Sequence, residues 1–156
     1  MTNNPLSILQ IKAKMESWCA YQERSHVEAR LKLKSFFLND TEIEFIIAEL
    51  ISSNFINEER FACAYARGKF RIKHWGRIKI LKGLKQFKLS EYCIKKAMKE
   101  IDEDEYINVL ETVLSKKGST IKEKNSLLKK IKLVKFALSR GFEYDLIQDC
   151  LKKLVN

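Results

Sequence analysis

The chain has 156 residues, of which 46% are hydrophobic and 32% are charged, and its formal net charge at pH 7 is +10. This composition excludes a disordered chain, and one proline with five glycines leaves too little material for the tight turns of an all-β protein. No apolar run in the sequence approaches the length of a membrane span, and the first residues lack the features of a secretory signal. We therefore expect an all-α, cytoplasmic protein without a membrane partner. The basic excess favours a polyanionic partner, of which nucleic acid is the commonest and an acidic membrane surface the rival.

The first third of the chain carries the signals of three helices. Apolar residues recur at helical spacing from Leu9 to Cys19 and predict the first helix. Ser25 followed by Glu28 forms a capping box, in which each side chain satisfies an orphan amide at the start of the second helix. Asn39 is predicted to cap the third helix. That helix is predicted to bury a stripe of Ile43, Ile46, Ile47 and Leu50.

The same order of signals recurs in the middle of the chain. Asn57 is predicted to cap a helix, with Glu58 and Glu59 in a first turn where the helix dipole favours anions. Gly76 marks a break, and Ser90 is predicted to cap a further helix. The residues predicted to face inward in these helices are Phe61, Ala64, Tyr65, Gly68, Ile80, Leu84, Phe87, Ile94, Ala97, Met98 and Ile101.

A third copy of the pattern follows the acidic link 102–105, whose carboxylates we interpret as a helix cap rather than a metal site. When the copies are superposed, apolar residues fall into register at offsets of 51 and then 53 residues. The registered positions are Leu33, Leu84 and Ala137; Leu38, Leu89 and Phe142; Ile43, Ile94 and Ile147; and Leu50, Ile101 and Leu154. We expect three tandem three-helix, helix-turn-helix-like repeats, 1–54, 55–101 and 102–156, stacked in a line so that each buries part of its core against the next.

The central repeat concentrates the positive charge. From Arg60 to Ser90 there is no Asp or Glu, while Lys and Arg supply ten positive charges. Like charges without an acidic neighbour in the sequence repel one another, and a polyanion would relieve that repulsion. Trp75 stands among these cations at the helix break, where an indole either packs under the turn or meets a partner. The predicted partner or nucleic-acid contacts are Arg67, Lys69, Arg71, Lys73, Trp75, Arg77, Lys79 and Lys82.

Catalytic and cofactor motifs are absent from the sequence. There is no Gly-rich phosphate loop, no nucleophile elbow and no metalloprotease motif, so we expect a non-enzymatic protein without a cofactor or a bound metal. The four cysteines, Cys19, Cys63, Cys93 and Cys150, stand far apart and are interpreted as reduced core residues. The residues predicted to have a structural role in the central repeat are Asn57, Arg60, Phe61, Tyr65 and Gly76.

The central repeat resembles a known family, the RecX regulators of bacterial recombination. The resemblance rests above all on the run from Phe55 to Ala62, which reads FINEERFA, followed by Tyr65, Arg71 and Trp75-Gly76. In the first repeat it rests on Arg24, Ser25, Glu28, Arg30, Lys32 and Leu33. That family often has a glycine before the turn that follows the second helix of a repeat. In this sequence Phe37 and Lys88 replace that glycine, and only Gly141 keeps it.

The resemblance implies a curved, elongated molecule that lies in the helical groove of the RecA filament on single-stranded DNA. It further implies a regulator of recombination and DNA repair that bridges neighbouring protomers and restrains filament growth, ATP hydrolysis and strand exchange. We expect a monomer that contacts its partner through the basic central face. Two alternatives are a stand-alone DNA-binding module of the helix-turn-helix kind and a helical scaffold for another protein. The first would need base-reading Asn, Gln or Arg, whereas these helices offer mostly lysine.

Overall fold

The computed structural model describes residues 6–155, which form helices and no strand. The first repeat contains α1 (Ile8–Tyr21), α2 (His26–Lys34) and α3 (Asp40–Ser52). The second contains α4 (Glu58–Arg71), α5 (Arg77–Lys85) and α6 (Glu91–Met98). The third contains α7 (Glu103–Thr120), α8 (Ser126–Ser139) and α9 (Tyr144–Val155). The predicted fold class, all-α with three tandem three-helix repeats in an elongated, curved array, is therefore confirmed.

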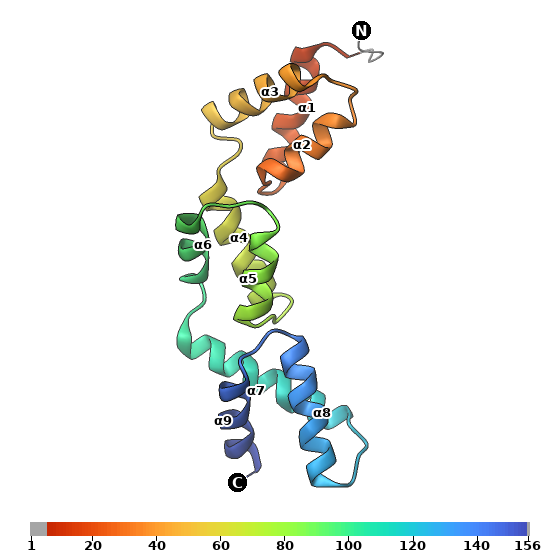
Figure 1. Ribbon diagram of the computed structural model, residues 1–156, viewed down its shortest axis with the longest axis vertical. Helices are drawn as coiled ribbons and strands as arrows, with labels where there is room; N and C mark the ends of the chain where they lie inside the picture. The colour runs from red at the N-terminus through yellow and green to blue at the C-terminus, as the bar shows by residue number, and fades with distance from the viewer. Residues whose placement is uncertain (1–5, 156) are drawn as a thin grey trace.

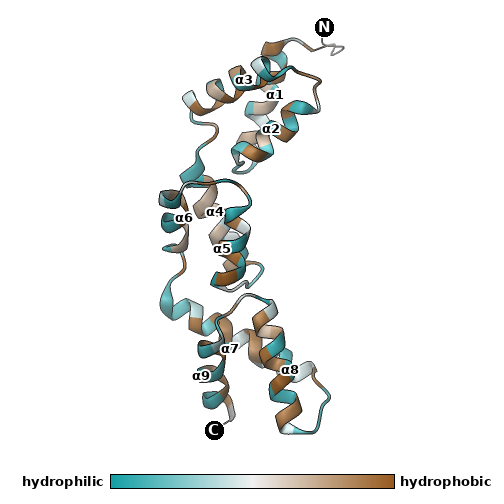
Figure 2. Cartoon of the chain, in the orientation of Figure 1, coloured by the Kyte–Doolittle hydropathy of each residue, from teal (hydrophilic) through white to brown (hydrophobic). Residues whose placement is uncertain are grey.

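The three repeats follow one another along the long axis of the molecule. Figure 1 shows α1–α3 at one end and α7–α9 at the other, with α4–α6 between them. In this view α2, α5 and α8 lie along one side of the array, and α3, α6 and α9 lie along the other. In Figure 2 hydrophobic and hydrophilic residues alternate as each helix turns, as expected of helices that bury one face.

Side-chain caps define most helix starts. The Ser25–Glu28 capping box is present at α2, and the Asn57 side chain accepts a hydrogen bond from the Arg60 amide at 2.9 Å at the start of α4. Ser90 and Asp102 cap α6 and α7 in the same way. These predicted caps are confirmed, and that at Asn39 is extended to a full capping box by Glu42.

The buried residues form two separate cores. One belongs to the first repeat and contains the predicted stripe of α3. The other runs without interruption through the second and third repeats, from Ala62 to Leu151. Between the first and second repeats lie two polar contacts, Arg60 Nε to Glu23 Oε1 at 2.9 Å and His26 Nδ1 to Glu58 Oε1 at 3.6 Å. The second and third repeats are therefore packed into one unit to which the first is joined mainly by polar side chains.

Some positions face a different way from the prediction. In α1 the buried face is Ile11, Met15 and Cys19, while Leu9 is 76% exposed. In α4 Ala62, Ala66 and Phe70 are buried beside Phe61, and the predicted Ala64, Tyr65 and Gly68 are only half-buried. Phe87, Ile94 and Met98 are half-buried as well. Leu154, in the last turn of α9, is 47% exposed.

The three positions of the family glycine share one backbone conformation. Phe37, Lys88 and Gly141 have φ values of 58°, 55° and 93°. Each stands where the chain turns after the second helix of its repeat. A left-handed conformation is unfavourable for a residue with a Cβ, so the first two repeats keep the turn although they have lost the glycine that suits it.

The third repeat differs from the other two near its first connection. The buried residues of α4 match Tyr106, Leu110 and Leu114 of α7 at an offset of 44, whereas α8 and α9 follow α5 and α6 at 53. Nine extra residues therefore separate the core of α7 from α8. They lengthen α7 to 18 residues and supply the connection before Asn125.

Candidate functional site

The predicted contact residues lie where α4 ends and α5 begins. Arg67, Lys69 and Arg71 are on α4, and Lys73 and Trp75 are in the turn that follows it. Arg77, Lys79 and Lys82 are on α5. The turn returns to the core at Gly76, so the two basic helix segments are held against one body.

Of the two roles that the sequence left open for Trp75, the structure shows the packing role. The Trp75 indole is half-buried and packs against the shared core of the second and third repeats. The Lys69 and Lys79 ammonium nitrogens lie 4.8 and 4.4 Å from its ring centroid, within the range of cation–π attraction. Its amide donates to the Lys69 carbonyl at 3.0 Å. Trp75 therefore fixes the position of one lysine from α4 and one from α5.

The arginines of the basic run have acidic partners, contrary to the interpretation that the run is unpaired. Arg67 lies 3.3 Å from Glu100, and Arg71 lies 4.0 Å from Glu105. Arg77 binds two carboxylates of the third repeat, Glu103 at 2.6 Å and Glu143 at 2.9 Å. The partners come from segments far along the chain, so the absence of nearby acids in the sequence did not reveal them. Like-charge repulsion is consequently weaker than the sequence suggested.

Unlike its arginines, the lysines of the run lie apart from the carboxylates of the described chain. Among the described residues, Lys69, Lys73, Lys79 and Lys82 have no carboxylate within 4.0 Å. Lys73 and Lys82 are exposed, and Lys69 and Lys79 are half-buried against Trp75. The positive charge available to a partner at this surface is therefore carried by lysine. We refer to Lys69, Lys73, Trp75, Lys79 and Lys82 as the lysine surface.

Arg77 belongs to a partly buried network between the second and third repeats. Its amide donates to the Tyr106 hydroxyl at 2.9 Å, and that hydroxyl donates to Glu143. Tyr106 is fully buried between Phe70 and Phe142. Burial, together with the hydrogen bond to Glu143, raises the pKa of Tyr106 far above its ordinary range. The Arg77 side chain is thus engaged within the molecule.

Gly76 brings the same two repeats into backbone contact. Its amide donates to the Arg140 carbonyl at 2.7 Å, and the Ile78 amide donates to the Gly141 carbonyl at 3.0 Å. A Cβ on Gly76 would lie 2.3 Å from the carbonyl carbon of Gly141, so only glycine fits there. Since Gly76 has no side chain to cap α5, the third repeat supplies the acceptors that the first turn of α5 requires.

The remaining motif residues hold the second repeat together and join it to the first. The rings of Phe61, Tyr65 and Phe87 form a trio with centroid separations of 4.9 to 6.0 Å. Tyr65 also packs on Gly83, where a Cβ would overlap its hydroxyl. Arg60 reaches out of α4 to Glu23 and to the Asn54 carbonyl, each at 2.9 Å.

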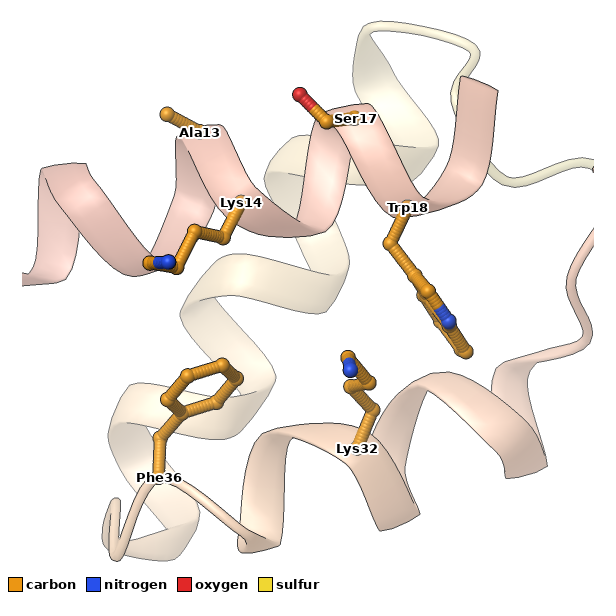
Figure 3. Close-up of a pocket in the computed structure, with 6 residues that line it drawn as sticks. All are labelled: Ala13, Lys14, Ser17, Trp18, Lys32 and Phe36. Atoms are coloured by element: carbon orange, nitrogen blue, oxygen red, sulfur yellow. The ribbon is translucent and has the colours of Figure 1, made fainter. Parts of the chain in front are cut away.

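A cleft occurs at the equivalent place in each repeat, along the outer face of its first helix. In the first repeat it has a volume of about 480 Å³ and lies between α1 and α2. Figure 3 shows Lys14 and Trp18 on α1, opposite Lys32 and Phe36 on the other side of that cleft. In the second repeat the equivalent residues include Tyr65 and Lys69, which line a cleft of about 330 Å³.

The third cleft is the largest, at about 570 Å³, and it lies between the end of α4, α7 and α8. Its lining includes Lys116, Lys117, Phe136 and Arg140, none of which the sequence interpretation selected. The register of 53 residues would have placed Phe136 and Arg140 opposite Gly83 and Phe87. The lysines of α7 correspond to the end of α4 at an offset of 44 residues, so the register of 53 residues did not indicate them.

Residues 6–155 contain no group of three or more potential ligands that could hold a metal ion. Over the same residues, no helix has the length and apolar character needed to cross a lipid bilayer. All four cysteines are free; Cys19, Cys93 and Cys150 are buried as predicted, whereas Cys63 is only half-buried because it lies beside the buried face of α4.

Comparison with known families matches two successive units of the chain. Residues 57–98 match the model of the second three-helix domain of RecX, and residues 103–151 match that of the third. Together the matches cover more than half of the chain.

Individual relatives extend the match into the first repeat. Regulatory protein RecX of Bacillus cytotoxicus is 25% identical over 138 residues, and that of Bacillus mycoides is 23% identical over the same length. These alignments cover 88% of this chain but 51% of each relative, so the chain spans about half the length of the curated relatives it matches.

Solved structures share the fold. The crystal structure of RecX from Lactobacillus salivarius superposes with a TM-score of 0.81 at 22% identity, covering 94% of this chain and 96% of that one. A second crystal structure, of regulatory protein RecX, superposes with a TM-score of 0.77 at 19% identity, covering 91% of this chain and 73% of that one.

Proposed function

This chain belongs to the RecX family, and we propose that it binds the RecA filament on single-stranded DNA and restrains ATP hydrolysis, filament growth and strand exchange. The observation that carries the proposal is the match of two successive three-helix units to the second and third domains of that family. A regulator of this kind acts in the cytoplasm by binding, as a monomer and without catalysis of its own.

The shape of the array supports this role. Three repeats in a row form an extended surface, and an extended surface can follow a groove and touch more than one subunit of a filament. The hydrophobic core that the second and third repeats share holds their surfaces together. The first repeat, joined mainly by polar side chains, can adjust to a neighbouring subunit.

The proposed contact is the lysine surface, with Arg67 and Arg71 at its edge. These lysines project from two helices that Trp75 holds together, and no carboxylate of the described chain neutralises them. Unpaired cations arranged on a rigid body favour electrostatic complementarity with DNA phosphates or with an acidic surface of a protein. Arg77 takes a supporting role, because its charge is used between the repeats.

The test measures the DNA-dependent ATPase of the cognate RecA as the protein is added. We expect inhibition, and we expect the double reversal Lys69→Glu/Lys79→Glu to require roughly tenfold more protein for the same effect. The matched control is Lys95→Glu/Lys99→Glu, which changes the charge equally on α6 and its C-terminus, on the side of the array away from α5. Absence of inhibition by the unmodified chain would reject the function. Equal loss in both variants would reject the lysine surface.

A stand-alone helix-turn-helix reader is less well supported. In such domains the last helix of the three enters the major groove. Here α3 carries Asp40, Glu42, Glu44 and Glu49, and α9 carries Asp145 and Asp149, so both would bring carboxylates to the phosphates. The charge distribution therefore favours contacts from the second helices α2, α5 and α8, which have the largest basic excess in their repeats.

A further inference from the structure

The cleft where α4 meets α7 and α8 gathers positive charge from three separate segments. Lys73 comes from the turn after α4, Lys116 and Lys117 from α7, and Arg140 from the end of α8. The lining contains no Asp or Glu. Within residues 6–155 none of these four cations has a carboxylate within 4.0 Å. The arginine-rich part of the surface is neutralised internally, whereas this cleft is not.

The cations are held in place by contacts across the cleft. The Arg140 guanidinium donates to the Lys73 carbonyl at 3.3 Å, which ties α8 to the turn after α4. The Lys117 ammonium and the Arg140 guanidinium lie 4.7 and 5.1 Å from the ring centroid of Phe136. Phe136 thus positions two of the four charges, as Trp75 does for Lys69 and Lys79.

The cleft continues into the one along α4. Ile72 and Lys73 line both, so the two clefts meet at these residues. Small residues form the floor beyond that point, and the position that a Cβ would take on Gly68 has no atom within 4 Å. We call the joined clefts the repeat-junction groove. Because it combines two clefts, this groove suits a polymer better than a single small anion.

The lining also discriminates between kinds of polymer. In the part between α7 and α8 the cationic side chains are hydrogen-bond donors only, and the Thr120 hydroxyl donates to the Lys117 carbonyl at 2.8 Å. The part along α4 also includes one carboxylate, Glu23, which is paired with Arg60. An extended acidic peptide would bring backbone amide donors that few side chains here could accept. A phosphodiester backbone carries acceptors only, with one negative charge for each nucleotide. The donor-rich groove therefore fits a nucleic-acid strand.

We propose that the repeat-junction groove binds the phosphodiester backbone of single-stranded nucleic acid, with Lys73, Lys116, Lys117 and Arg140 as its phosphate contacts. The groove does so without RecA, and most of these residues lie outside the lysine surface. The first-repeat cleft offers Lys14 and Lys32 at the equivalent place, but it shares no lining residue with the other two and is not included.

The test is a fluorescence anisotropy titration of a labelled oligothymidylate of about 20 nucleotides over a series of salt concentrations, with no RecA present. The groove variant is Lys116→Gln/Lys117→Gln, and the charge-matched control is Lys95→Gln/Lys99→Gln. We expect the groove variant to bind roughly tenfold more weakly. The slope of log K against log salt should flatten by about 1.4, since each phosphate contact on a single strand contributes about 0.7.

A second pair of variants keeps the test valid if the lysine changes disturb folding. Gly68→Glu places a carboxylate over the floor of the groove, where the structure has room for it, and Gly68→Gln adds the same bulk without charge. Weaker binding by the Glu variant than by the Gln variant supports the groove. Three results overturn it: no binding by the unmodified chain, equal losses in groove and control variants, or displacement of the oligonucleotide by polyglutamate at equal charge.

The last of these results would identify an acidic protein segment as the occupant instead. The outcome is independent of the proposed regulation of RecA, because the filament is absent from the titration. Absence of oligonucleotide binding by the unmodified chain, with its ATPase inhibition intact, would reject the groove alone. Oligonucleotide binding without inhibition of the RecA ATPase would reject the regulatory function alone.

Discussion

The guanidinium of Arg77 lies 4.0 Å from the ring centroid of Tyr106, and the Arg77 amide donates to the hydroxyl of the same tyrosine. The two residues belong to neighbouring repeats. The Arg77 side chain also binds Glu103 in the first turn of α7 and Glu143 just before α9, so one side chain of α5 joins two separate segments of the third repeat. The most basic segment of the chain thus contributes to cohesion as well as to binding.

Arg77→Ala should destabilise the protein far more than Lys79→Ala, although each removes one positive charge. The arginine change leaves Glu143 with one partner fewer in a half-buried site, which we expect to lower the free energy of unfolding by about 1–3 kcal/mol. The Lys79 ammonium lies over the face of Trp75, and this contact should contribute about 0.5 kcal/mol. Urea denaturation measures both, and equal effects would contradict a clamp at Arg77.

Gly76→Ala and Gly68→Ala should change stability in opposite directions. A Cβ on Gly76 would overlap the Gly141 backbone, so that change should lower the free energy of unfolding by about 2–3 kcal/mol. Gly68 lies within α4 with free space around it, and alanine there should raise the free energy of unfolding by about 0.5–1 kcal/mol. Thermal denaturation followed by circular dichroism gives both signs. A tolerated Gly76→Ala would disprove the close approach of the two repeats.

Lys88→Gly should stabilise the chain, because it restores glycine at a backbone position with φ 55°. We expect a gain of about 1 kcal/mol in the free energy of unfolding, measured in urea. Gln86→Gly is the control, since Gln86 has an ordinary helical φ of −68° and glycine there should lower stability by about 0.5–1 kcal/mol. A loss of stability in both variants would show that the Lys88 side chain is needed in its turn.

Thiol reactivity should separate Cys63 from Cys19. Burial raises the pKa of Cys19 to about 11, so at about pH 8 almost none of it is thiolate, and the reactive fraction grows as the pH rises towards that value. Burial also raises the pKa of Cys63, but its side chain is half-exposed and accessible to a reagent. Iodoacetamide followed by mass spectrometry should therefore label Cys63 first. Equal rates in the folded chain would contradict this, and urea should make the two rates alike.

The local part of the fold could be predicted because its causes are local. Ser25, Asn57 and Ser90 accept hydrogen bonds from amides three residues ahead, and the buried stripe of α3 follows from its helical period. The repeat register also allowed the order of the helices along the chain to be predicted. The rotation of α4 about its axis could not be predicted, since alanines supply much of its buried face and give little hydrophobic signal.

The candidate site was only partly predictable for a related reason. A run of charge is visible in the sequence, but its pairing depends on carboxylates brought close by folding, such as Glu100 for Arg67 and Glu143 for Arg77. The repeat-junction groove combines residues from three segments, and the longer α7 removed Lys116 and Lys117 from the register that would have indicated them. Sequence reasoning located the charged region and could not say which charges are free.

The contact between Gly76 and Gly141 also sets an order of events during synthesis. The first-turn amides of α5 find their acceptors in Tyr106 and in the backbone of the third repeat, which leaves the ribosome much later. Until then α5 has no cap and its neighbours lack part of their core. The first repeat, with a core of its own, can fold as soon as it emerges. We therefore expect the nascent chain to mature in two steps, with the basic helices of the middle repeat reaching their final arrangement only after Gly141 has been synthesised.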